Sequence, residues 1–211
     1  MSEDAVRPIR ELLQGQWPGE WGTDPKDSES GTLVYRSTEL DDHGHIDEKG
    51  GTRRKIVEAK VQSKRLLPGD VLLEASGGTP GRPVGRVGLY SGARGEDALC
   101  ANFLRVLRPK SIVDGSYLRW ALLQLHRQPA IWRFQQQTTG MVNLKVSDYL
   151  RHMLGVPELR IQRKGGIHFP LVGLTCPVRE RLSGGMVVGR SAQLVGVGGR
   201  TEDREPWMFA G

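Results

Sequence analysis

Short apolar runs separated by turn residues occupy the first half of the chain. The clearest run is Val71-Leu72-Leu73, which follows the turn signal Pro68-Gly69-Asp70 and has the length of a buried strand. Runs of this kind predict strands at residues 32–38, 55–61, 71–74, 84–90 and 101–107. Several short strands in succession favour one curved sheet or a partial barrel.

A helical period, with apolar residues three and four positions apart, is clearest over residues 116–128. Ser116 stands where it could cap this helix, and Pro129 where it would end it. The apolar stripe, which we assign to the core, consists of Leu118, Ala121, Leu122 and Leu125. A shorter helix is predicted over residues 4–14. Together these elements predict an α+β fold: a curved mixed or antiparallel β-sheet forming a partial barrel, with a few packed helices.

The segment between the strands at 71–74 and 84–90 combines backbone freedom with restraint. Residues 76–83 contain three glycines, which allow close approach to a partner, and two prolines, which limit the conformations of the loop. Such a loop can hold Thr79 and Arg82 outward, and strand alternation directs Arg86 away from its apolar neighbours Val87 and Leu89. A structural hairpin loop with incidental arginines remains an equal alternative from spacing alone.

Composition adds bounds but no function. The chain has 211 residues, a net charge of +6, 37% hydrophobic and 26% charged residues, which is ordinary for a soluble globular domain. Before Leu159 there are 22 basic against 20 acidic residues, so bulk charge is weak support for an anionic partner. Cys100 and Cys176 are read as reduced thiols, and the polar N-terminus is no signal peptide. We therefore expect a cytoplasmic protein with no membrane association.

The last quarter of the chain differs from the rest. From Leu159 onward it holds ten glycines in 53 residues and shows no sustained helical stripe. This composition predicts one folded domain over residues 1–158 and a poorly ordered or non-homologous Gly/Arg-rich tail over residues 159–211.

The sequence offers little support for catalysis. Asp70 and Glu74 lie close together in a strand-like context typical of magnesium-dependent nucleases, but the lysine expected two residues after Glu74 is replaced by Ser76. The stretch 41–45 carries two aspartates and two histidines, which in a polar turn more often form the turn than bind a metal. No phosphate-binding or methyltransferase-type glycine loop occurs. We expect no enzyme activity, with a small metal-dependent nuclease as a less favoured alternative.

Two longer motifs and three shorter ones resemble a known family. The longer ones are LPGDVLLEASGGTPGRPVGRVGLY at residues 67–90 and the TTG, NLK and SDYL sequence at residues 138–150. The shorter ones, in the same order as in the family, are VYRST at 34–38, NFLRVLRPK at 102–110 and YL at 117–118. Over about residues 15–158 the chain resembles a single target recognition domain from the specificity subunit of type I restriction-modification systems.

This resemblance implies a division of labour. Such a subunit reads double-stranded DNA without catalysis and serves phage defence by directing two partners, an adenine-specific DNA methyltransferase subunit and a restriction (nuclease-translocase) subunit. S-adenosylmethionine and ATP belong to these partners, so no cofactor is expected here. The chain departs from the family in having one recognition domain and lacking the long spacer helix after residue 159, which favours a truncated or half-length relative. A degenerate protein-interaction module that binds a methyltransferase without DNA selectivity is the alternative.

Candidate DNA contacts follow from side-chain chemistry at these motifs. Arginine can bond guanine bidentately, glutamine can do the same with adenine, and threonine can contact a thymine methyl. Basic residues on flexible loops contact phosphates, although a charge run is more often a solvated surface. We expect base readout by Thr79, Arg82, Arg86, Gln136 and Thr139, and phosphate contacts by Arg53, Arg54, Lys55 and Lys64.

Overall fold

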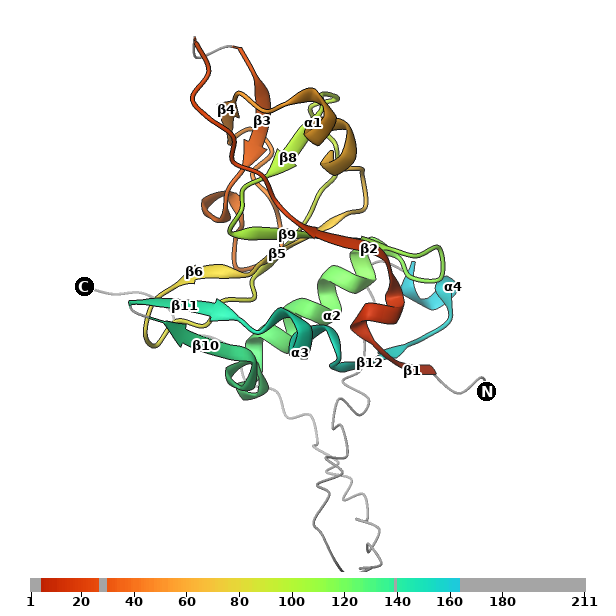
Figure 1. Cartoon of the computed structure of the whole chain (residues 1–211). Coiled ribbons are helices and arrows are strands. Elements are labelled where there is room, and N and C mark those ends of the chain that lie inside the picture. Colours follow the sequence, from red (N-terminus) through yellow and green to blue (C-terminus); the bar gives the residue numbers. More distant parts are fainter. Residues whose placement is uncertain (1–4, 27–29, 139, 164–211) are drawn as a thin grey trace, which may run out of the picture. The chain divides into compact units, whose positions relative to one another are not determined.

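The computed structural model describes residues 5–26, 30–138 and 140–163 (Figure 1). Within them the strands are β1 Ala5–Pro8, β2 Leu13–Pro18, β3 Thr32–Tyr35, β4 Thr52–Arg54, β5 Val71–Glu74, β6 Ser76–Gly78, β7 Val87–Leu89, β8 Ala98–Cys100, β9 Leu104–Pro109, β10 Gln135–Thr138, β11 Met141–Leu144 and β12 Met153–Val156. The helices are α1 Glu58–Lys64, α2 Gly115–Arg127, α3 Val146–Leu150 and α4 Leu159–Gln162, with 3-10 helices η1 Ile9–Leu12, η2 Ser37–Glu39 and η3 Pro129–Phe134. The α+β class is confirmed.

The central sheet has the strand order β2-β9-β5-β7 and is antiparallel throughout. All four residues of β5 are buried, because the strand has a hydrophobic core on each side. Val71 and Leu73 pack into one core, and Leu72 packs into the other. The remaining strands form three smaller sheets, and in the described part of the chain none of them closes into a barrel.

Helix α2 covers one side of the central sheet. Its predicted apolar stripe is buried in the same core as Val71 and Leu73. The predicted cap is wrong, however: the helix begins one residue earlier, and the Asp114 carboxylate accepts the backbone N–H groups of Ser116 at 2.9 Å and Tyr117 at 3.3 Å.

Strand β3 lies between β4, which is antiparallel to it, and β8, which is parallel. The prediction of a strand at 55–61 is wrong, because this segment leaves β4 and turns into α1. Only Val61 of α1 is buried, and Val57 before it is 68% exposed. A single buried apolar position shows no periodicity, so the sequence could not distinguish a strand from a short helix at this segment.

The predicted helix at 4–14 is also wrong. Its residues form β1, η1 and the start of β2, and β1 pairs with β12 from the other end of the described chain. Pro8 ends β1, and the Ile9 N–H donates to the His152 carbonyl at 2.9 Å rather than to a helical partner. A long-range backbone pairing therefore replaces the local helix.

Beyond residue 158, α4 still contacts the domain. The buried Gln162 amide accepts the Asp114 N–H at 2.8 Å and donates to the carbonyls of Pro157 at 2.7 Å and Ile112 at 3.2 Å. The boundary at residue 158 stays a prediction, and so does the expectation for residues 164–211, which lies with Cys176 outside the described residues. Cys100 is a free, buried thiol whose pKa burial raises to about 12. None of the described helices has the length and apolar character needed to cross a membrane.

Candidate nucleic-acid interface

The loop between β6 and β7 begins with a tight turn. Arg82 donates its backbone N–H to the Thr79 carbonyl at 2.9 Å, which closes the turn Thr79-Pro80-Gly81-Arg82. Pro80 and then Gly81, whose φ is +85°, occupy the two central positions, as a type II turn requires. All four residues are exposed, so the turn holds Thr79 and Arg82 toward solvent, as the sequence predicts.

This turn lies next to the second long motif, although about 60 residues separate them in the chain. Strand β6 pairs with β11, through Ser76 with Asn143 and Gly78 with Val142, and β11 pairs with β10. The resulting three-stranded sheet, in the order β10-β11-β6, extends to one side of the molecule in Figure 1. The fold thereby joins the two sequence motifs into one surface.

The two faces of this sheet differ in character. Val142 and Leu144 point into the core, and Gln135 anchors the sheet by donating to the carbonyls of Val84 and Ile131, each at 3.1 Å, and accepting the Val84 N–H at 3.0 Å. The alternate positions form the opposite face, which we call the outer face. Its members are Ser76, Gln136, Thr138, Met141 and Asn143.

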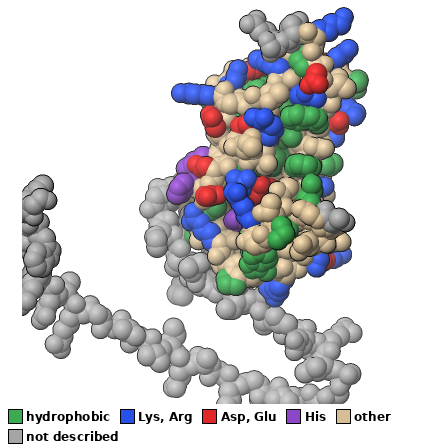
Figure 2. All heavy atoms as spheres, turned by 90° about the vertical axis from the view of Figure 1, so that its left-hand side faces the viewer, with side chains coloured by type: hydrophobic (Ala, Val, Ile, Leu, Met, Phe, Trp, Pro, Cys, Tyr) green, Lys and Arg blue, Asp and Glu red, His purple; other side chains and the backbone are tan. Residues whose placement is uncertain are grey.

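A hydrogen-bond chain orders the outer face. The Ser76 hydroxyl donates to Asn143 Oδ1, Asn143 Nδ2 donates to Thr138 Oγ1 at 3.2 Å, and the Thr138 hydroxyl donates to the Met141 carbonyl at 3.3 Å. These polar side chains carry no charge. Figure 2 shows the side of the molecule toward which the sheet extends, with basic, acidic and apolar side chains intermixed. This surface is therefore characterised by the hydrogen-bonding groups of its uncharged side chains and not by an electrostatic potential of a single sign.

Sequence reasoning missed four of the five outer-face residues. It selected Gln136, which is exposed here, but not Ser76, Thr138, Met141 or Asn143. Strict alternation from Gln136 would have selected Thr138 in place of its neighbour Thr139. Thr139 itself lies outside the described residues.

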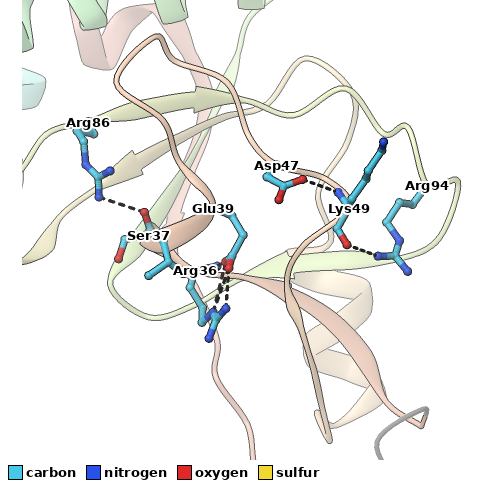
Figure 3. A network of polar contacts seen from close by, with 8 residues as sticks. Arg36, Ser37, Glu39, Asp47, Lys49, Arg86 and Arg94 are labelled. Atoms are coloured by element: carbon cyan, nitrogen blue, oxygen red, sulfur yellow. Dashed lines mark hydrogen bonds and ion pairs between the residues drawn. The ribbon is translucent and has the colours of Figure 1, made fainter.

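Arg86 does not lie beside Arg82 on the exposed turn. Its guanidinium donates to Glu74 Oε1 at 2.7 Å and Oε2 at 3.0 Å, and to the Leu40 carbonyl at 2.8 Å. It also donates to the Ser37 carbonyl at 3.0 Å, the contact drawn in Figure 3. The side chain is only 14% exposed, and the hydrogen bond to Glu74 raises its pKa above the usual value. Four protein acceptor atoms thus engage the Arg86 guanidinium, and the predicted part of Arg86 in base readout stays a prediction.

A cavity of about 120 Å³ lies where the turn meets Arg86. It is lined by Ser37, Glu74, Gly77, Gly78, Thr79, Arg82, Pro83 and Arg86. The arginine with free bonding capacity at this cavity is Arg82, since no hydrogen bond or ion pair of the described residues engages its guanidinium.

The predicted phosphate contacts gather on a different part of the fold, around β4 and α1, which Figure 1 shows well away from β6, β10 and β11. Lys55 is exposed. Arg53 forms an ion pair with Glu96 at 2.6 Å, and Lys64 forms one with Glu20 at 3.1 Å.

Arg54 differs from its basic neighbours. Its side chain is 10% exposed and forms an ion pair with Asp24. The guanidinium also donates to the Trp21 carbonyl at 3.0 Å and lies 4.4 Å from the centre of the Trp21 ring. Arg54 therefore packs within the protein rather than extending to solvent as a phosphate contact would.

Asp70 and Glu74, the two carboxylates considered for a nuclease site, each form an ion pair with an arginine. Asp70 accepts two bonds from the Arg108 guanidinium, at 2.7 and 2.8 Å, and one from the Leu67 N–H at 2.8 Å. Glu74 is similarly bound by Arg86. Each carboxylate serves a separate buried ion pair, so the two do not form a magnesium-binding pair.

The aspartate-histidine stretch at 41–45 forms a turn. Asp41 Oδ1 accepts the backbone N–H groups of His43 and His45, both at 2.8 Å, and Oδ2 lies 3.0 Å from His45 Nδ1. Burial opposes ionisation of Asp41, but these hydrogen bonds prevail and lower its pKa to about 2. Within the described ranges, His, Cys, Asp and Glu form no group of three suited to a metal.

The α+β fold is similar to that of a chain from a type I restriction-modification (R-M) system. A chain of a type I R-M system, solved in work on its complex assembly and conformational transition, aligns over 75% of this chain and 35% of its own length, with 18% identity and a TM-score of 0.50. The HsdS subunit from Thermoanaerobacter tengcongensis (18% identity, 75% and 34% coverage, TM-score 0.46) and the S subunit from M. genitalium (15%, 71% and 33%, 0.44) are also similar.

This chain therefore spans about a third of the length of these solved chains. No protein-family model matches it, and no curated protein does.

Proposed function

We propose that this chain reads DNA sequence as a single target recognition domain of a type I restriction-modification specificity subunit. The observation that carries the proposal is the pairing of β6 with β11, which places β6, β11 and β10 in one sheet. The exposed Thr79–Arg82 turn follows directly after β6 in the chain. Two segments that resemble the family in sequence thus meet on one exposed polar surface. The structural likeness to a type I R-M chain supports the same assignment.

The chemistry of this surface suits base edges. Arg82 can fork onto O6 and N7 of a guanine, the Gln136 amide can bond an adenine, and Thr79 can contact a thymine methyl. Thr139, next to this surface in sequence, belongs to the same proposed set. Arg86 lines the same cavity as Thr79 and Arg82, where Glu74 and the Ser37 carbonyl bind it.

Affinity in this proposal comes from basic residues away from the sheet. Lys55 is exposed, and Arg53 and Lys64 would exchange their partly buried carboxylate partners, Glu96 and Glu20, for phosphates. Arg54 lies outside this set because it packs on Trp21. Phosphate contacts would position the domain and make binding salt-dependent, while the sheet specifies sequence.

Catalysis in this proposal belongs to partner subunits, an adenine-specific DNA methyltransferase and a nuclease-translocase, which would bring their own cofactors. The two carboxylates that a nuclease would need are bound by Arg86 and Arg108 instead. A single recognition domain reads one short half-site, so its affinity is modest compared with that of two linked domains.

Selection from a randomised duplex pool, followed by fluorescence anisotropy at two salt concentrations, tests the proposal. We expect one short sequence to be enriched, with affinity that falls as salt rises. Equal affinity for every duplex would refute sequence reading. If the protein then still co-purified with a methyltransferase, that result would favour a protein-interaction module.

A further inference from the structure

Gln136 and Asn143 lie directly opposite each other on the antiparallel strands β10 and β11. Side chains at such positions are about 5 Å apart at their Cβ atoms and point to the same face. That face is the outer face, since the neighbouring positions Val142 and Leu144 are buried in the core. Two side-chain amides are therefore presented side by side by a two-stranded ribbon.

The two amides differ in how they are held. Asn143 Oδ1 accepts from the Ser76 hydroxyl and Nδ2 donates to Thr138 Oγ1 at 3.2 Å, so its orientation is fixed. Each amide atom keeps capacity for one further bond, because a carbonyl oxygen has two lone pairs and an NH2 group has two hydrogens. Gln136 is exposed, and no hydrogen bond within the described residues engages its amide. A fixed amide thus lies next to a free one.

We propose that the β10–β11 ribbon enters the major groove and that Gln136 and Asn143 each read an adenine, in neighbouring base pairs. This inference rests on the proposed function and deepens it by naming the bases that the ribbon reads. The major groove, about 12 Å wide, admits a two-stranded ribbon. Successive base pairs rise by about 3.4 Å, a step that two side chains about 5 Å apart at their Cβ atoms can match by rotation about their side-chain bonds.

Adenine fits these amides better than the other bases do. An amide offers one acceptor and one donor, which match the N6 amino group and N7 of adenine, whereas guanine offers two acceptors, O6 and N7. The outer face has no arginine or lysine to bond guanine and no carboxylate to accept from cytosine. Its remaining opposed pair, Thr138 and Met141, supplies apolar groups suited to the thymine methyls of A·T pairs.

The test compares Gln136→Ala and Asn143→Ala with wild type on the sequence selected from a randomised duplex pool. Each substitution should remove the preference for one adenine, a loss of about tenfold or more in discrimination at that position. Replacing that adenine by 7-deazaadenine, which lacks N7, should weaken wild-type binding and leave binding of the matching variant unchanged. Gln137→Ala is the matched control, because Gln137 neighbours Gln136 but points to the other face.

Unchanged thermal unfolding of each variant would establish that the fold is retained. If wild type selects a sequence and both variants keep its adenine preferences, the adenine readout is refuted while DNA reading stands. If wild type selects no sequence, DNA reading itself fails. Insensitivity of wild type to 7-deazaadenine at every adenine of the selected site would also overturn the inference.

Discussion

Arg86 and Glu74 form a bidentate ion pair at the cavity that Thr79 and Arg82 of the exposed turn also line, with N···O distances of 2.7 and 3.0 Å and side chains only 14% and 8% exposed. The same two residues are joined through the backbone, where the Glu74 N–H donates to the Arg86 carbonyl at 2.8 Å. Arg86 also bonds the carbonyls of Leu40 and Ser37. One side chain thus connects β5, the loop after β6 and the segment around η2.

Glu74→Ala should destabilise the protein strongly. It leaves the buried Arg86 guanidinium without its counter-charge, which typically costs about 3 kcal/mol or more of the free energy of unfolding. Urea unfolding followed by circular dichroism measures this change. Arg151→Ala, which breaks an ion pair whose two side chains are 60% and 55% exposed, is the control and should cost less than about 1 kcal/mol. Equal unfolding midpoints for the two variants would contradict a stabilising role for the buried pair.

Arg82→Ala should change DNA binding and leave stability intact. Its side chain is exposed and unengaged within the described residues, so we expect the free energy of unfolding to change by less than about 0.5 kcal/mol. If Arg82 forks onto a guanine, discrimination at one G·C pair should fall by about 1 to 3 kcal/mol. Anisotropy titrations with single-base variants of the selected duplex measure this loss.

Arg10→Ala is the charge-matched control for Arg82, because Arg10 is exposed on η1, which Figure 1 shows away from the β10-β11-β6 sheet. It should leave discrimination at every position unchanged. A uniform loss of affinity in Arg82→Ala, without a change at any one base pair, would assign Arg82 to phosphate binding instead.

The sequence predicts elements well where local signals are complete. Strand β5 has the predicted bounds because a turn precedes it and all its apolar residues are buried, and α2 follows its long apolar stripe. The segment around Val61 was misassigned because its single buried apolar position suits a short helix as well as a strand. The segment around Ile9 was misassigned because its structure depends on a distant partner, the His152 carbonyl. Local periodicity carries no information about such pairings.

In the candidate site, too, local features could be predicted from the sequence and contacts with distant residues could not. The glycines and prolines of residues 76–83 predict a loop that holds Thr79 and Arg82 outward, and both residues are exposed. Alternation correctly directs Arg86 away from Val87, but the acceptors that occupy it lie on other elements, Glu74 on β5 and Ser37 on η2. Opposite charges at the facing ends of two predicted strands are the one sequence signal that could have indicated this pair.

Asp114→Ala should weaken α2, because its carboxylate accepts the N–H groups of Ser116 and Tyr117 at the start of the helix. Loss of such a cap costs about 1 kcal/mol. Ser116→Ala is the matched control and should cost clearly less, since Ser116 lies within the helix rather than at its cap. Thermal unfolding of the two variants distinguishes them, and a larger effect of Ser116→Ala would restore the cap predicted from sequence.

His126 should make the protein less stable as the pH falls. Burial lowers the pKa of His126 below its ordinary value of 6.5, and its Nε2 lies 3.5 Å from the Pro83 carbonyl at the end of the exposed turn. Below pH 6.5 the unfolded chain therefore binds a proton that the folded chain resists. The contribution of neutral His126 to the free energy of unfolding is fully present above pH 6.5 and is lost as the pH falls toward the lower pKa of the folded state.

Urea midpoints between pH 8 and pH 5 should fall less steeply in His126→Gln than in wild type. His152, whose pKa burial also lowers, should account for part of the remaining slope. The control is His43→Gln at an exposed position, and an equal reduction of the slope in that variant would show that the burial of His126 is not the cause.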